Sequence, residues 1–218
     1  MNDTNEEMLQ TDARLGRPLV ALQASNETLS ASRWAAAAGV PTAEVGMMAE
    51  QLRGLGVEVE GSVAAGFRLA GEADLALSEV LEPKLAETIF AGGIRHFAKI
   101  GSTSAAAMRA GAEELAEREA NGTIQDALRG AVWLAEEQTA AKGRAGHVWM
   151  ADSTDGIYFS ALLRPRLAPA DVIILSLAAG LAVVEAVHEI TGMRGDLRWP
   201  NDVLMSGRRC TTWWWASE

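Results

Sequence analysis

The sequence predicts an α+β protein built from two regions that meet near residue 80. Residues 18–69 have the pattern of three short helices followed by two short strands. After residue 81, strands and helices mix without the regular alternation of a doubly wound sheet. A chain of 218 residues, 49% of them hydrophobic, is long enough to bury a core in one or two domains. We therefore expect four segments: a disordered acidic N-terminus (1–17), two domains (18–80 and 81–209) and a tail (210–218).

The elements of the first region follow each other closely. Helices are expected over residues 18–24, 30–38 and 42–55, with Gly39 ending the second and Thr42 capping the third after Pro41. Residues 57–60 alternate with period two, and residues 66–69 follow a five-residue turn, which predicts a hairpin. Three helices and a hairpin in this order are typical of a winged helix-turn-helix. A generic three-helix domain is the alternative.

The charge of the first region disagrees with a role in reading DNA. Residues 1–80 contain 5 Arg, no Lys and 12 Asp plus Glu, so their net charge is 5 − 12 = −7 of the total of −10. Binding to phosphates needs several Lys or Arg side chains. The third helix offers only Thr42, Gln51 and Arg53 as candidate contacts to operator DNA. An interaction domain or a vestigial domain is the alternative.

The second region combines strands over residues 95–100, 132–135, 156–163 and from 197, with helices over residues 105–120 and 170–191. The apolar run Val172–Val187 is interrupted by Ser176 and Glu185. We therefore expect a buried helix, with no membrane span and no membrane partner. The single cysteine and the acidic start of the chain indicate a cytoplasmic protein.

One segment between two expected strands carries the residues of a phosphate-binding loop. It combines two glycines, Gly143 and Gly146, with the basic side chains Lys142, Arg144 and His147. Glycine lets the backbone approach a ligand closely, and the cations neutralise phosphate oxygens. The glycine spacing matches neither the Walker A loop nor the dinucleotide fingerprint. Composition alone leaves a basic surface loop as the alternative.

Four motifs in order resemble those of the biotin protein ligases. They are Gly101-Ser-Thr-Ser, the loop Gln-Thr-Ala-Ala-Lys-Gly-Arg-Ala-Gly-His-Val-Trp149, Gly156-Ile-Tyr-Phe-Ser and Arg198-Trp-Pro-Asn-Asp. The resemblance extends from Pro18 to Arg209 and includes the N-terminal winged helix of the bifunctional members, which also repress biotin synthesis. It implies a class II synthetase-like (biotin/lipoyl ligase) mixed-sheet catalytic domain that is incomplete here.

The resemblance also implies a two-step reaction. Biotin is activated with ATP and Mg²⁺ to biotinyl-5′-AMP, and biotin is then transferred to a lysine of a biotin carboxyl carrier protein. A homodimer and binding to operator DNA are further implied properties. Two alternatives stay open: a ligase-dead, biotin-responsive DNA-binding regulator or decayed gene product, and a lipoyl or octanoyl transferase.

The resemblance assigns a role to each matching residue, and no metal ligand. The catalytic residues would be Lys142, Arg144 and Asp202, with Asp202 orienting or deprotonating the incoming lysine amine. Biotin would contact Ser102, Thr103, Ser104, Gln138, Lys142, Gly143 and Arg144, with Gln138 beside the linkage to the adenylate. The nucleotide would contact Arg144, Gly146, Trp149 and Asn201. The pocket would be lined by Gly156, Tyr158 and Ser160. Ser102 and Thr103 could instead simply cap the following helix.

The sequence departs from the family pattern at several positions. Ser104 replaces a usual Asn, Ala141 a usual Gly and His147 a usual Arg, while Arg209 stands where the family has a lysine. Residues 210–218, which include three consecutive tryptophans, match no family pattern. We therefore expect a truncated catalytic domain with an open sheet edge and self-association through the exposed tail.

Overall fold

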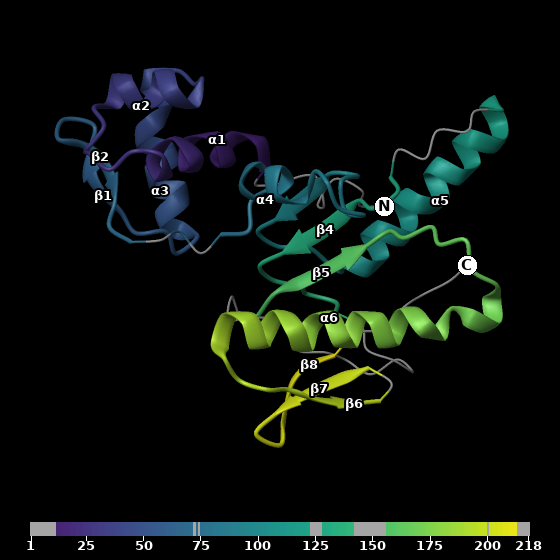
Figure 1. The fold of residues 1–218 in the computed structure, drawn as a ribbon. Helices are drawn as coiled ribbons and strands as arrows, with labels where there is room; N and C mark the ends of the chain where they lie inside the picture. Colours follow the sequence, from purple (N-terminus) through teal and green to yellow (C-terminus); the bar gives the residue numbers. More distant parts are fainter. Residues whose placement is uncertain are drawn as a thin grey trace. The chain divides into compact units, whose positions relative to one another are not determined.

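The computed structural model describes residues 12–71, 73, 75–122, 128–141, 156–199 and 201–212. These residues form two compact units, which are treated separately: residues 12–141 with 156–163, and residues 164–212. Figure 1 labels their helices and strands. Both units contain helices and sheets of mixed or antiparallel strands, so the prediction of a mixed α+β architecture is confirmed.

The first unit begins with three helices: α1 (Asp12–Gln23), α2 (Ala31–Ala38) and α3 (Val45–Gly54). Gly39 ends α2 at a φ of 69°, as predicted. Ser30, which was expected to be the first residue of this helix, instead caps it: its hydroxyl accepts a hydrogen bond from the Arg33 amide. Thr42 does not cap α3. It starts a short 3-10 turn, Thr42–Glu44, that leads into the helix.

Helix α1 begins at Asp12 rather than at Pro18, so residues 12–17 are helical and not part of a disordered N-terminus. The physical reason is the spacing of Leu15, Leu19 and Leu22, which are all buried on one face of the helix. Pro18 lies inside the helix, where its carbonyl accepts a 2.8 Å hydrogen bond from the buried Trp34 indole. The prediction that Pro18 starts the first helix is therefore wrong.

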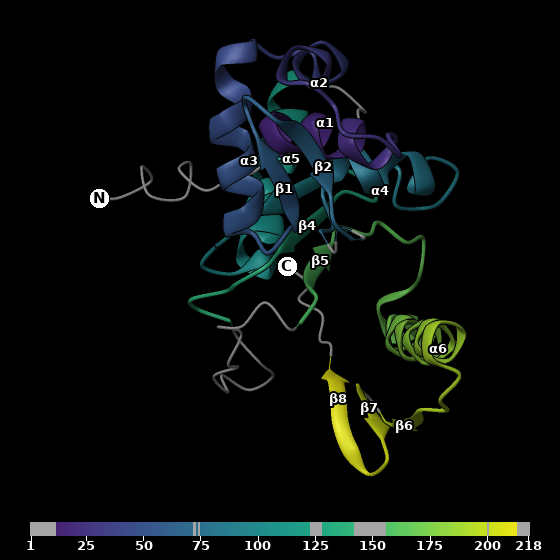
Figure 2. The ribbon, with the colours of Figure 1, turned by 90° about the vertical axis from the view of Figure 1, so that its left-hand side faces the viewer.

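An antiparallel hairpin follows the helices, formed by β1 (Val59–Ser62) and β2 (Gly66–Leu69). Figure 2 shows the hairpin beside α3. Leu29 pairs with Phe67 and so adds a short bridge to β2. The Arg53 side chain of α3 donates hydrogen bonds to the carbonyls of Val59 (2.7 Å) and Gly61 (2.9 Å). These bonds fasten the helix to the hairpin.

The core beneath these elements extends beyond the hairpin into the segment that follows it. Leu75 and Leu77 are buried in the same apolar cluster as the three helices. They lead into α4 (Ser78–Leu85), a helix that the sequence analysis did not predict. Helix α4 packs against α1 and β3, so it joins the two parts of the first unit.

The remainder of the first unit is a three-stranded sheet of β3 (Ile94–Phe97), β4 (Val132–Ala135) and β5 (Tyr158–Ala161). Strands β3 and β4 are parallel, and β5 runs antiparallel to β4. Helix α5 (Thr103–Asn121) packs against β4 and β5 (Figure 1). A second apolar cluster lies between helix and sheet and contains Phe97, Ile100, Ala106, Ala107, Ala131, Trp133 and Ala135.

The second unit consists of one long helix and an antiparallel sheet. Helix α6 (Ile173–Thr191) follows a 3-10 turn at Pro169–Asp171 and lies alongside β6 (Asp196–Arg198) and β7 (Asp202–Met205) (Figure 1). Strand β8 (Arg208–Thr212) completes the sheet in the order β6-β7-β8. Residues 210–212, which the sequence analysis assigned to a tail outside the fold, therefore belong to an ordered strand.

The predicted buried helix is wrong, because α6 is largely exposed. Gly180 is the buried residue of this helix, while Ile174, Leu181 and Ile190 are each more than half exposed. Within its unit, α6 packs against β6 and β7, which are too few elements to cover a helix that is apolar on all sides. An 18-residue window of this 19-residue helix has a mean hydropathy of 1.8, so the helix also meets the length and composition of a membrane span, contrary to expectation. Core helices of soluble proteins share these two properties.

Candidate functional site

The candidate biotin contacts begin at the N-terminus of α5. Ser102 and Thr103 are both buried. The Ser102 hydroxyl accepts a 3.4 Å hydrogen bond from the Ala105 amide, so Ser102 caps the helix. Ser104 lies one residue further along α5 and is half-buried. The capping role considered for Ser102 is thus present in the structure.

A hydrogen-bonded cluster joins three of the predicted residues: Thr103 on α5, Gln138 after β4 and Ser160 on β5. Gln138 Oε1 accepts bonds from the Thr103 amide (2.8 Å) and from the Thr103 hydroxyl (3.2 Å). The Thr103 hydroxyl also lies 2.9 Å from the Ser160 hydroxyl. A parallel bridge between Ile100 and Gln138 brings the two chain segments together. We call these three residues the Thr103 cluster.

The positions of the protons in the Thr103 cluster determine which hydrogen bonds it can form with a ligand. Because Gln138 Oε1 accepts two bonds, the Gln138 amide nitrogen remains as a donor. The single proton of the Thr103 hydroxyl goes to Gln138, so Ser160 must donate its own proton to Thr103. The Ser160 oxygen can then only accept a further bond. The cluster therefore presents a donor at Gln138 and an acceptor at Ser160.

Two further pocket candidates lie on or next to β5. Tyr158 and Ser160 are two residues apart on the strand, so their side chains project from the same face of the sheet. Gly156 lies against Tyr158, since a Cβ atom at position 156 would be 2.7 Å from both the phenolic carbon and the oxygen. Because Gly156 has no side chain, the Tyr158 ring can occupy the space next to it.

The predicted residues of the second unit lie at the start of β7. Asn201 precedes the strand, and Asp202 is its first residue. Asp202 Oδ2 lies 3.2 Å from Arg209 Nη2 of β8, and the Asp202 side chain is only 15% exposed. Arg198 of β6 is paired directly opposite Asp202. Sequence reasoning gave no role to Arg209, because only the pairing of β7 with β8 brings it to the carboxylate.

The predicted phosphate-binding loop lies outside the described residues. This applies to its five candidate residues, Lys142, Gly143, Arg144, Gly146 and Trp149. Their predicted contacts with biotin and nucleotide stay predictions. Within the described part of the chain, no group of three or more His, Cys, Asp or Glu side chains is arranged to hold a metal ion.

The DNA-contact candidates are on the first helical elements. Thr42 is the first residue of the 3-10 turn before α3, and Gln51 is exposed on α3. Arg53 is engaged with the hairpin backbone and with Glu50, at 2.5 Å. These bonds occupy the guanidinium of the one candidate that carries a positive charge.

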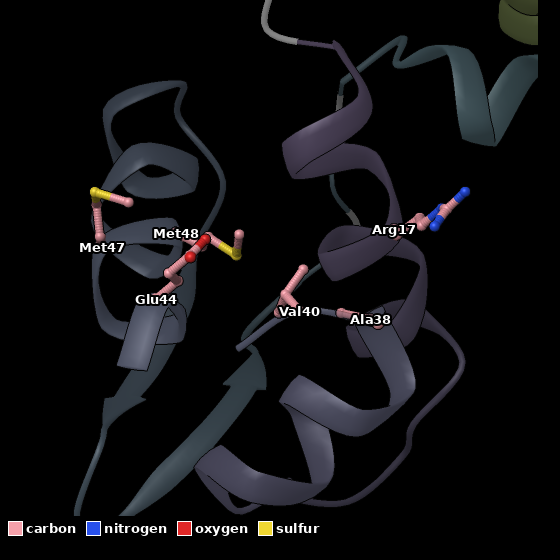
Figure 3. Close-up of a pocket in the computed structure, with 7 residues that line it drawn as sticks. Arg17, Ala38, Val40, Glu44, Met47 and Met48 are labelled. Atoms are coloured by element: carbon pink, nitrogen blue, oxygen red, sulfur yellow. The ribbon is translucent and has the colours of Figure 1, made fainter. Parts of the chain in front are cut away.

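A hollow of about 380 Å³ lies among α1, α2 and α3 (Figure 3). Methionine side chains from α3 and the residues that end α2 contribute to it, and none of the predicted biotin or nucleotide contacts does. Its lining consists of Arg17, Ala38, Gly39, Val40, Glu44, Met47 and Met48. The hollow is thus separate from the Thr103 cluster.

A buried contact between a histidine and a carboxylate was missed by sequence reasoning. His96 on β3 is fully buried, and its Nε2 lies 2.6 Å from Glu136 Oε1, just after β4. The two residues are 40 positions apart in the sequence. Their approach depends on the parallel pairing of β3 with β4, which no local pattern reveals.

Comparison with known proteins finds a family whose pattern part of the chain matches. Residues 118–211 match the biotin/lipoate A/B protein ligase family. This match and the relatives described below confirm the resemblance to the biotin protein ligases that the motifs predicted.

The particular relatives are biotin ligases. The chain is 29% identical to the bifunctional ligase/repressor BirA of Bacillus subtilis over 187 residues, which are 86% of this chain and 54% of that protein. It is 39% identical to the biotin–[acetyl-CoA-carboxylase] ligase of Mycobacterium tuberculosis over 114 residues, or 50% of this chain and 39% of that protein. The chain thus spans about half the length of the BirA proteins that it matches.

A solved structure with a similar sequence is the biotin protein ligase from Aquifex aeolicus in complex with biotin and ATP. The two are 30% identical, and the match covers 53% of this chain and 43% of that chain. The TM-score between the two structures is 0.40.

Proposed function

We propose that this chain has the activity of a biotin protein ligase. Biotin and ATP would give biotinyl-5′-AMP and pyrophosphate, and biotin would then pass to a lysine of a biotin carboxyl carrier protein with release of AMP. The observation that carries the proposal is the Thr103 cluster. It unites residues from three of the four motifs, separated by up to 57 positions in the sequence, in one hydrogen-bonded group.

The polarity of the Thr103 cluster suits biotin. The ureido ring of biotin carries a carbonyl acceptor next to N–H donors. The Gln138 amide can donate to that carbonyl, and the Ser160 oxygen can accept from an N–H. Residues of a site built to bond such groups are costly to leave unpaired, so the cluster would discriminate against ligands without them. Ser102, Ser104, Gly156 and Tyr158 would line the same pocket.

We assign the phosphate chemistry to the predicted loop. Lys142, Gly143, Arg144 and Gly146 would neutralise and approach the phosphates of ATP, and Trp149 would pack beside the adenine. Asn201 would contact the nucleotide, and Asp202 would receive the carrier lysine. Mg²⁺ would arrive with ATP, because this ion is usually held by phosphate oxygens and water with only one or two carboxylates.

The N-terminal elements support a winged helix-turn-helix as part of the proposal. Three helices, a hairpin and the Leu29–Phe67 bridge occur in the required order. The names of the BirA relatives link ligase and repressor functions. Two observations disfavour operator DNA as a partner: Arg53 is bonded to the hairpin, and residues 1–80 have a net charge of −7. A cytoplasmic location and a homodimer complete the proposal.

The experiment that tests the ligase proposal measures biotin-dependent release of pyrophosphate from ATP by the 218-residue chain. We expect release that requires biotin, is lost in Arg144→Ala and is preserved in Arg33→Ala, which removes an exposed cation of α2. Lipoate is the competitor that separates the two branches of the family. Release supported by lipoate instead of biotin would assign the chain to lipoyl transfer, and no release with either acid would contradict the proposal.

A further inference from the structure

The carboxylate of Asp202 has a cation fixed beside it in the second unit. Its Oδ2 is 3.2 Å from Arg209 Nη2, and the arginine side chain is 49% exposed. Asp202 itself is mostly covered, so the pair is less screened by water than one on an open surface. An ion pair at this distance limits the orientations of the carboxylate. Arg209 is therefore placed to control how Asp202 meets an incoming group.

A β-bulge is what brings Arg209 to the face of Asp202. The register pairs Val203 with Thr211, but it then shifts and pairs Leu204 with Arg209. Without this shift, Arg209 would oppose Met205 and project from the other face of the sheet, because side chains alternate along a strand. With the shift, Arg209 shares the face of Leu204 and Asp202. Bulges commonly redirect a side chain in this way.

The neighbouring strand β6 adds a second cation on the same face. Arg198 is the direct partner of Asp202 in the antiparallel register, and directly opposed residues project to the same side of a sheet. Arg208, by contrast, is paired with Met205 and belongs to the opposite face. Both strands next to β7 thus carry an arginine on the face of Asp202.

We propose that Arg209 is a positioning residue for Asp202, holding its carboxylate so that it orients the ammonium group of the carrier lysine. This inference rests on the proposed ligase function. The ion pair uses Oδ2, so Oδ1 is the oxygen that receives the lysine. The pair thus bears on orientation, one of the two roles that the sequence left open for Asp202.

The transfer step balances without a proton acceptor in the protein. The lysine arrives as an ammonium, since its ordinary pKa is about 10.4, and it loses one proton to water before attack. Its nitrogen forms a bond to the acyl carbon of biotinyl-adenylate, and the bond from that carbon to the phosphate oxygen breaks. AMP leaves with the electron pair, and the second proton of the nitrogen passes to water.

The test supplies biotinyl-5′-AMP and a biotin carboxyl carrier domain to the full chain and follows transfer. We expect Arg209→Ala to lower kcat for transfer about tenfold, or ~1.4 kcal/mol, while biotin-dependent pyrophosphate release is unchanged. Arg209→Lys should restore part of the rate, because it keeps the charge without the planar fork. Arg208→Ala, on the opposite face of the same strand, should match the wild type.

Two further readouts separate positioning from a general loss of structure. In an Asp202→Asn background, Arg209→Ala should have no further effect, because the group that it positions is already altered. Transfer to hydroxylamine, a nucleophile that is neutral at pH 7, should be insensitive to Arg209→Ala. A loss that persists in the Asp202→Asn background or extends to hydroxylamine would overturn the inference. Wild-type chain that neither releases pyrophosphate nor transfers biotin would overturn the proposed function and this inference together.

Discussion

The hydroxyl of Thr103 joins three segments that lie far apart in the sequence. It donates to Gln138 and accepts from Ser160, while the Thr103 amide bonds to the same Gln138 oxygen. This arrangement leaves the Gln138 amide nitrogen as the outward donor. A change of one hydroxyl should therefore alter the polarity of the whole cluster.

Replacing Thr103 by valine keeps the shape of the side chain but removes this hydroxyl. We expect Thr103→Val to raise the Kd for biotin roughly tenfold, because Gln138 loses one of its two anchoring bonds and the Ser160 proton loses its acceptor. Isothermal titration with biotin measures the change.

Thr88→Val is the matched control for this prediction. Its hydroxyl donates to the Leu85 carbonyl at the end of α4, outside the Thr103 cluster. It should leave the Kd for biotin unaltered. Equal affinities of Thr103→Val and the wild type would show that the cluster does not contact biotin.

At the scale of elements, the hairpin and the helices depend on each other through close backbone contacts. Gly66 begins β2 with a φ of 85°, and a Cβ atom there would be 2.6 Å from the Leu29 carbonyl oxygen. A Cβ atom at Gly54, the last residue of α3, would meet nothing within 4 Å. The backbone at position 66 therefore requires glycine, whereas position 54 has room for a side chain.

Alanine substitutions at these two glycines should have effects of opposite sign. Gly66→Ala combines a left-handed φ with a backbone clash, so we expect it to lower the free energy of unfolding by roughly 2 kcal/mol. Gly54→Ala should raise it by up to about 1 kcal/mol, because alanine favours the helix and restricts the unfolded chain. Urea denaturation followed by circular dichroism measures both. A Gly66→Ala protein as stable as the wild type would contradict the described path of β2 past Leu29.

At the scale of the whole molecule, α6 exposes several large apolar side chains among the described residues. Ile174 and Leu181 are 53% and 55% exposed, although a soluble chain seldom leaves a long apolar helix open to water. Burial of this surface between copies would release water from it and favour association. Self-association, which the sequence analysis attributed to the terminal tail, thus has a described structural source in α6.

We expect the purified chain to self-associate and Ile174→Glu combined with Leu181→Glu to increase the monomer fraction severalfold. Charged side chains on the exposed face make its burial between copies unfavourable. Size-exclusion chromatography with light scattering gives the fraction. Ile89→Glu, at a residue 69% exposed in the first unit, controls for added charge and should change little. A monodisperse wild-type monomer would contradict the expectation.

Local elements were predictable because the residues that define them are neighbours in the chain. Gly39 ends α2 as expected, and β4 covers the predicted residues 132–135. The start of α1 was missed because Pro18 was taken as a boundary, although Leu15 already belongs to the buried face. Strands β7 and β8 were missed because their sequence lacks clear alternation and is joined by a tight turn in which Ser206 and Gly207 have φ of 51° and 76°.

The sequence by itself determined the order of the motifs, the end of α2 at Gly39 and the resemblance to the biotin protein ligases, since each depends on residue types at short or fixed spacing. Only the tertiary structure decided which side chains meet. The Thr103 cluster requires the pairing of β4 with β5 and the position of α5, and the Asp202–Arg209 pair requires a bulge that shifts the register. A shift of one residue sends a side chain to the other face of a sheet, so such contacts depend on pairing that local sequence does not specify.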